Sequence, residues 1–265
     1  MHHRATLLAG ICGLLLSAAA VQPAMAAAPA GFAGAIDGEY ANANFSGGGG
    51  NADIWGITAA GAFSLGRPDL GAQIDGGWHR WSGSGADLDQ WNIGGSLFWA
   101  PAFGRVGATV AYTSLDLGGG LDINATSYGV FGEYFFSDVL TFGAHGGGVT
   151  ASGLGSSDTG GYIGGGLTGY IIPNFALMGT IDYFDVAGGS TTTYGVGAEW
   201  QVSQMLPVSV YGGYRYNDFS GGGGHVDVWF IGVRFYAGGM GMPLVGNHRN
   251  GTLGWVGQPL RNIQF

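Results

Sequence analysis

Turn-forming segments recur about every dozen residues along this chain, and they are of two kinds that strictly alternate. One kind is rich in Gly or Ser and usually adjoins an Asp; its segments are 46–53, 82–87, 116–122, 152–158, 185–190 and 220–227. The other kind is tighter and carries Pro, Asp or Arg; its segments are 65–70, 100–105, 137–139, 172–174 and 203–207. Eleven such turns predict twelve strands, with all turns of one kind on the same edge of the sheet.

The segments between these turns alternate in polarity with a period of two residues, which indicates β-strands. In 225–236, for example, Trp229, Ile231 and Val233 fall on one face, while Phe230 and Arg234 fall on the other. The segment 35–45 is less regular because Asn42 and Asn44 interrupt its apolar face. We therefore expect a β-bulge there, or an early exit of the strand from the membrane.

The composition favours lipid as the solvent on one side of these strands. Charged residues make up only 9% of the chain, against about 25% in soluble domains, and Lys is absent. Aromatic residues gather near both kinds of turn, as in the two girdles of a membrane barrel. A soluble β-sandwich is the alternative, but it would not need two rims of different chemistry. The sequence thus predicts an all-β fold, a transmembrane antiparallel up-and-down β-barrel of twelve strands with short loops.

The first 26 residues have the features of a secretory signal peptide. His2, His3 and Arg4 precede an apolar stretch at 7–21, and Ala24-Met25-Ala26 forms a small-x-small site with cleavage expected after Ala26. A short membrane anchor is the weaker alternative because the apolar stretch is too short. Cys12 is the sole cysteine, so the predicted mature chain has no disulfide and no thiolate metal site. The barrel is predicted to comprise residues 27–236. An even number of strands brings both of its ends to the same side of the membrane. Because the signal peptide delivers the N-terminus to the periplasm, both ends and the tight turns are expected there.

Polar and charged residues fall mainly on the inward face, because charge facing lipid is costly. The predicted lumen-lining residues are Asp75, His79, Gln90, Asn92, Arg105, Glu133, His145, Asp182, Glu199, Arg215 and Arg234, together with Asp37, Glu39 and Gln73. Six of these are acids and three are Arg, which predicts a pore with a weak preference for cations. A polar lining that merely contacts water explains the same pattern equally well.

Nine aspartates crowd the predicted extracellular rim: Asp53, Asp87, Asp89, Asp116, Asp122, Asp158, Asp185, Asp218 and Asp227. They are either solvated strand ends, which we favour, or a site for divalent cations that bridge lipopolysaccharide phosphates. His225 lies near Ser220 and Asp227 in the sequence, but no nucleophile motif, zinc pattern or calcium loop is present. We therefore predict no enzyme activity, cofactor or metal site. The acidic net charge of −9 argues against a nucleic-acid partner.

Residues 237–265 lack alternation and contain Pro243 and Pro259. This segment is predicted to be a periplasmic tail or a plug that folds back into the lumen.

The signal peptide, the alternating strands and the segment WFIGVRFY at 229–236 resemble the small outer-membrane β-barrel or porin-like proteins of Gram-negative bacteria. The resemblance covers 27–236 and concerns architecture. In that family the aromatic-ended assembly signal usually ends the chain, whereas a tail follows it here. The resemblance implies location in the outer membrane, with outer-membrane lipid, lipopolysaccharide, the outer-membrane assembly machinery and small solutes as partners.

Twelve strands lie between eight-stranded barrels, which side chains fill, and sixteen-stranded barrels, which hold a water channel. Small inward residues favour a narrow conduit. The predicted function is therefore a narrow passive channel for small solutes with weak cation preference. A structural or surface-interaction barrel with a closed lumen is the alternative, and a lipid-modifying barrel enzyme is a third hypothesis.

Overall fold

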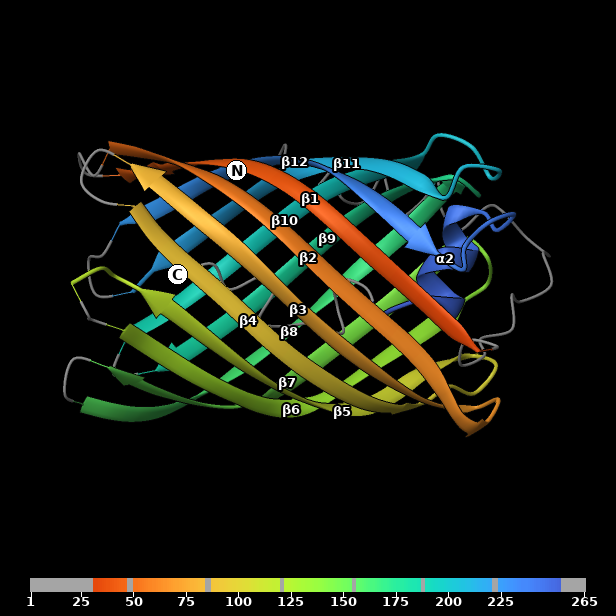
Figure 1. Cartoon of the computed structure of the whole chain (residues 1–265), viewed down its shortest axis with the longest axis horizontal. Helices are drawn as coiled ribbons and strands as arrows, with labels where there is room; N and C mark the ends of the chain where they lie inside the picture. Colours follow the sequence, from red (N-terminus) through yellow and green to blue (C-terminus); the bar gives the residue numbers. More distant parts are fainter. Residues whose placement is uncertain are drawn as a thin grey trace, which may run out of the picture.

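The computed structural model describes residues 31–46, 50–83, 87–119, 122–153, 156–186, 189–220 and 224–253. Twelve antiparallel strands form a closed barrel in which each strand pairs with its chain neighbours and β1 pairs with β12 (Figure 1). The strands are β1 (Phe32–Phe45), β2 (Gly50–Arg67), β3 (Leu70–Gly83), β4 (Asp87–Trp99), β5 (Gly104–Asp116), β6 (Asp122–Phe136), β7 (Leu140–Gly153), β8 (Ser156–Ile172), β9 (Phe175–Val186), β10 (Gly189–Gln201), β11 (Val208–Phe219) and β12 (His225–Ala237). A short helix, α2 (Leu244–Asn250), follows them. The predicted fold class and strand number are confirmed, whereas the predicted signal peptide lies outside the described residues.

The two kinds of turn lie at opposite ends of the barrel. The tight turns, at 68–69, 100–103, 137–139, 173–174 and 202–207, define what we call the tight-turn rim. The Gly- and Asp-rich connections define the loop rim. β1 begins and β12 ends at the tight-turn rim, and α2 lies at the same rim, on the right of Figure 1.

The seam between β1 and β12 is regular. Its register runs without interruption from Gly34 opposite Ala237 to Phe45 opposite Val226, and the pairing of β1 with β2 is equally continuous. The expected bulge near Asn42 is therefore wrong. Asn42 points outward and donates a 2.8 Å hydrogen bond to the Asp53 carboxylate, so its polarity is satisfied without a change in the backbone. The register shifts in the barrel lie instead beside tight turns, between Ser64 and Arg67 on β2 and between Tyr170 and Ile172 on β8.

The outer face carries a continuous set of exposed large apolar side chains. Examples are Ile93, Val130, Ile163, Val196 and Ile231, each more than half exposed. Soluble proteins rarely expose apolar patches of such extent, and lipid is the environment that such a belt fits. The described part of the chain contains no helix long and apolar enough to cross a membrane.

A girdle side chain is held in place at the tight-turn rim. Trp99 Nε1 donates to Asp69 Oδ2 at 3.0 Å, and Arg67 pairs with the same carboxylate at 2.7 Å. The Arg67 hydrogen bond, with a smaller contribution from Trp99, holds the pKa of the Asp69 carboxyl below its usual value. Tryptophan with its N–H at the polar edge and its ring on the apolar belt is typical of a membrane interface.

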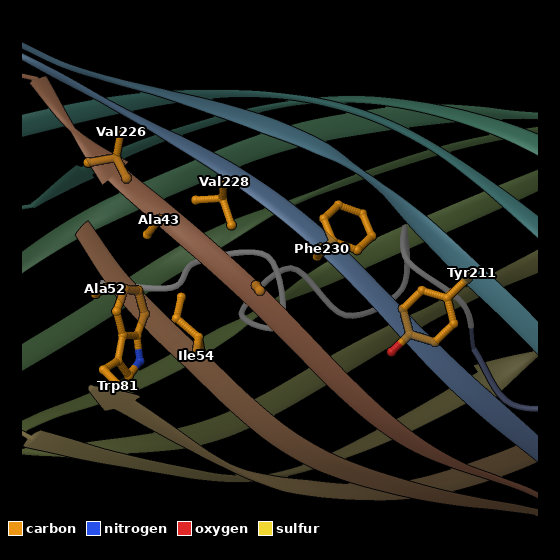
Figure 2. Packing of buried hydrophobic residues seen from close by; sticks show 9 residues of the cluster. Ala43, Ala52, Ile54, Trp81, Tyr211, Val226, Val228 and Phe230 are labelled. Carbon is orange, nitrogen blue, oxygen red and sulfur yellow. The ribbon is translucent and has the colours of Figure 1, made fainter. Parts of the chain in front are cut away.

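The inner wall is less polar than the sequence predicted. On β1, β2, β3 and β12, a group of buried apolar side chains faces the interior, and Tyr211 of β11 extends this group towards the tight-turn rim (Figure 2). Its members include Ala43, Ala52, Ile54, Trp81, Tyr211, Val226, Val228 and Phe230. A period-two pattern assigns faces, but an apolar residue fits either face of a membrane strand, so this cluster was not predicted.

Large inward side chains lie flat against glycines of neighbouring strands. A Cβ added to Gly232 would meet the Tyr211 ring at 2.4 Å, and one added to Gly213 would meet the Phe230 ring at 2.7 Å. Such approaches are possible only where a side chain is missing. The rings therefore cover the wall rather than extend towards the barrel axis.

Candidate functional site

All eleven predicted lumen-lining residues lie at inward-facing positions of their strands. Asp75 and Asn92 are half-buried. The other nine are buried: His79, Gln90, Arg105, Glu133, His145, Asp182, Glu199, Arg215 and Arg234. Period-two alternation places them there, because one face of each strand meets lipid. Their contact with a solute remains a prediction.

One group of charges joins β1, β10 and β12. Arg234 Nε lies 2.5 Å from Asp37 Oδ1, and its Nη1 lies 2.9 Å from Glu199 Oε2. The Ser209 and Tyr236 hydroxyls both donate to Glu199 Oε1 at 2.5 Å. These carboxylates are at most 3% exposed in their side chains, so each needs the partners it has.

A second ion pair links β5 to β6. Arg105 Nε donates to Glu133 Oε2 at 2.6 Å, and both side chains are almost fully buried. The remaining Arg105 nitrogens point to the chain beyond β12: Nη2 donates to the His248 carbonyl oxygen at 2.8 Å and Nη1 to that of Gly251 at 3.2 Å. The guanidinium group thus fixes the C-terminal segment to the wall.

We call residues 238–253 the inner segment, because from Leu244 onwards it lies against inward-facing side chains. Leu244 and Val245 pack with Tyr170, Ala176 and Tyr236 of the wall. The Leu253 amide donates to Gln73 Oε1 on β3 at 2.7 Å. These residues therefore contact the inner wall of the barrel, whereas 254–265 lie outside the described part of the chain. The choice between a periplasmic tail and a lumen plug for 237–265 stays a prediction.

Two residues of α2 join the charged lining, and the sequence did not reveal them. His248 lies 3.3 Å from Glu199 Oε2 through Nε2 and 3.0 Å from the Tyr170 hydroxyl through Nδ1. Arg249 Nη2 donates to the carbonyl oxygens of Ser137 and Leu140 at 2.5 and 2.9 Å. The sole signal was an adjacent His and Arg in a tail otherwise poor in charge, because a seven-residue helix is too short to show periodicity.

A third group has a different character. On β7 and β9, His145 Nε2 lies 2.9 Å from Asp182 Oδ1. Beside them is a cavity of about 230 Å³ that extends towards the loop rim and is also lined by Tyr162, Phe184 and Thr193. His145 Nδ1, Asp182 Oδ2 and the Tyr162 hydroxyl have no hydrogen-bond partner among the described residues.

Arg215 on β11 and Glu39 on β1 form a longer ion pair. Arg215 Nη2 is 3.9 Å from Glu39 Oε2, and the guanidinium carbon lies 4.3 Å from the centre of the Phe230 ring. His79 faces the same space, and its ring crosses Gly56 of β2. Cation–π contact and a long ion pair together hold Arg215 against the apolar part of the wall.

The rim carboxylates contact local partners. Asp87 pairs with Arg80 at 2.9 Å, and Asp227 accepts a hydrogen bond from the Tyr214 hydroxyl. His225 lies 3.7 Å from Asp227, and the Ser220 hydroxyl accepts from the Ser190 amide at 2.9 Å. Within the described ranges, no three His, Cys, Asp or Glu residues come together as metal ligands would.

This geometry defines a class: a closed twelve-stranded membrane barrel with a partly charged lumen. Neither the protein-family models nor the curated proteins gave a match. Solved structures did. The NanC porin has a TM-score of 0.55 at 12% identity, over 76% of this chain and 98% of its own. The KdgM porin in complex with disordered oligogalacturonate has a TM-score of 0.53 at 11% identity, over 76% and 98%.

An outer-membrane channel from Pseudomonas putida F1 has a TM-score of 0.53 at 12% identity, over 82% of this chain and 99% of its own. At these identities the likeness concerns the fold. The predicted porin-like barrel fold of outer-membrane type is confirmed.

Proposed function

We propose that this chain is an outer-membrane channel of a Gram-negative bacterium, through which small solutes diffuse passively with a weak preference for cations. The observation that carries the proposal is a closed twelve-stranded barrel whose inward face combines glycines and other small residues with charged side chains. Structural neighbours that are porins and channels support it. One of these neighbours was solved in complex with oligogalacturonate, and the proposal for this chain does not include that solute. No catalytic step is part of the proposal.

The balance of charges supports a weak rather than a strong preference. Six inward carboxylates face the guanidinium groups of Arg105, Arg215 and Arg234 and, in addition, that of Arg249 from α2. The lining is therefore acidic by two charges when its histidines are neutral. Most of the carboxylates already contact a guanidinium group, which reduces the field available to a passing ion.

The inner segment supports a narrow pathway. It contacts β3 through Gln73, β5 through Arg105 and β12 through Tyr236, so it spans the interior at the tight-turn rim. The apolar outer belt supports outer-membrane lipid as the surrounding partner. Lipopolysaccharide and the assembly machinery remain expected partners of the same proposal.

Single-channel recording in planar bilayers tests the function. The refolded full chain should give small, stable conductance steps, and a salt gradient should give a reversal potential of the sign expected for modest cation preference. Inserted, refolded protein without conductance steps would contradict the channel, and a reversal potential of opposite sign would contradict the preference.

A structural barrel with a closed lumen is the second candidate, and the same inner segment favours it. Its hydrogen bonds to separate parts of the wall, such as Arg249 to Leu140 on β7 and Leu253 to Gln73 on β3, are those expected of a fixed plug. Full chain that inserts without conducting, combined with conductance after removal of the segment, would favour this candidate.

A further inference from the structure

The cavity beside Asp182 differs from the rest of the charged lining in its chemistry. Asp37, Glu133 and Glu199 each contact a guanidinium group at 2.5–2.9 Å. The ion pair of Asp182 is with His145. A guanidinium group offers a carboxylate several donors in a fixed fork, whereas an imidazole nitrogen offers at most one. Asp182 therefore keeps more acceptor capacity than the three carboxylates that contact a guanidinium group.

The same carboxylate is buried and incompletely hydrogen-bonded. Asp182 is 9% exposed and its neighbour Tyr162 is 6% exposed. Neither Asp182 Oδ2 nor the Tyr162 hydroxyl has a hydrogen-bond partner in the part of the chain that the structure describes. Because buried polar atoms normally have partners, Asp182 Oδ2 is available to a ligand that brings its own donors. An ammonium group brings three donors and a positive charge.

The rest of the cavity is mainly apolar. Phe184 and Val186 of β9 and Phe219 of β11 line it towards the loop rim. The Thr193 hydroxyl donates to Asn217 Oδ1 at 2.8 Å, so that pair is already satisfied. A ligand body in this space meets aromatic faces, which attract cations as well as apolar groups.

The position of the carboxylate is enforced by a glycine. A Cβ added to Gly164 of β8 would lie 2.0 Å from Asp182 Oδ1 and 2.7 Å from His145 Nε2. The pair therefore lies across Gly164, flat against the wall, with the cavity open beside it.

We propose that this cavity is a binding site for small organic cations, namely a primary amine carried on an aromatic or apolar body. Asp182 Oδ2 accepts the ammonium group, and Phe184 and Phe219 contact the body. The proposal rests on the proposed channel and names the solute class that the channel would favour.

Binding of 2-phenylethylamine to the refolded full chain in detergent, followed by calorimetry, tests the site. Its neutral counterpart 2-phenylethanol has a similar body and no charge. We expect the amine to bind in the millimolar range or tighter and the alcohol to bind at least about tenfold more weakly. Equal affinities would overturn recognition by charge, and no binding of the amine would overturn the site.

Variants locate the binding. Asp182→Asn should weaken amine binding about tenfold or more and leave alcohol binding unchanged, because a single charge is lost. Asp75→Asn, the same change on β3 outside the cavity, is the matched control and should leave both affinities unchanged. An equal loss in both variants would overturn the assignment to this cavity. If Asp182→Asn does not refold, Gly164→Ala decides, since its Cβ displaces the carboxylate and should weaken binding of the amine more than binding of the alcohol.

The binding experiment is independent of conduction. A barrel that conducts without binding the amine would contradict the site and leave the channel in place. A barrel that binds the amine without conducting would contradict the channel and leave the site in place.

Discussion

The two ends of the lumen use charged side chains in opposite ways. At the tight-turn rim, Arg105 and Glu199 form short ion pairs with Glu133 and Arg234, and both also contact the inner segment. Towards the loop rim, Asp182 and His145 border an open cavity with hydrogen-bonding atoms to spare. The ion pairs of the first arrangement stabilise the barrel, whereas the second arrangement leaves hydrogen-bonding atoms that a ligand can contact.

The difference shows that charge on the inward face is not by itself evidence of solute contact. Buried carboxylates that already contact guanidinium groups contribute little to an ion's path and much to rigidity. A solute is expected to interact with those lining residues whose polar atoms still lack hydrogen-bond partners. Four experiments test this division.

The largest expected effect is on stability, from Arg234→Gln. This change leaves Asp37 and Glu199 buried without their guanidinium partner, so the free energy of unfolding should fall by about 3–5 kcal/mol. Urea titration of the barrel folded in lipid vesicles measures it. Arg67→Gln, at an arginine whose side chain is 70% exposed, is the control and should have a much smaller effect. A similar loss in both variants would remove the distinction between the ends.

Removal of the inner segment should have the next largest effect, on conductance. A chain that ends after Ala237 keeps all twelve strands but loses α2 and its contacts with Glu199 and Arg105. Single-channel conductance should rise several-fold because the tight-turn rim is no longer narrowed. An unchanged conductance in a correctly refolded truncated chain would show that the narrowest point lies elsewhere.

A methyl group can sharpen the comparison at the cavity. Gly164→Ala places a Cβ against Asp182 and His145, so the carboxylate must move and 2-phenylethylamine binding should fall about tenfold. Gly179→Ala on β9, where the nearest atom is 3.9 Å away, is the matched control and should leave affinity intact. Calorimetry compares the two. Unchanged binding to the Gly164 variant would mean that the position of the pair is unimportant.

The smallest effect concerns the tight-turn rim outside the membrane. Because Arg67 lowers the pKa of Asp69, the ionised carboxylate stabilises the folded barrel. That contribution is fully present above about pH 4, the ordinary range of an aspartate, and is lost as the pH falls below it. Asp69→Asn should therefore be slightly less stable than wild type at pH 7 and equal to it in strong acid. A pH-independent difference in urea unfolding would contradict this account.

The sequence predicted the barrel well because its two signals are local and redundant. Each strand carries its own alternation, and a register error of one residue would turn Arg234 or Glu199 towards lipid. The inward position of all eleven lining residues followed from the same rule. The alternation does not predict which inward side chains of different strands contact each other. Those contacts determine that Glu133 forms an ion pair with Arg105, whereas Asp182 borders a cavity.

The failures have equally specific causes. Asn42 suggested an irregular strand, but Asp53 on the adjacent strand satisfies its side chain and β1 stays regular. Trp81 and Ile54 turned out to be part of an apolar inner wall because apolar residues are compatible with either face. His248 and Arg249 belong to a short helix stabilised by tertiary contacts rather than by its own sequence.

The contacts of the inner segment also predict when this segment docks during folding of the barrel. Its partners are contributed by strands from β3 to β12, so the binding surface does not exist until β1 has met β12 and the ring is complete. We therefore expect docking of α2 to be the last step of folding. Pulsed proteolysis during refolding should find the chain near Arg249 cleavable until the rest of the barrel resists digestion, and earlier protection would contradict that order.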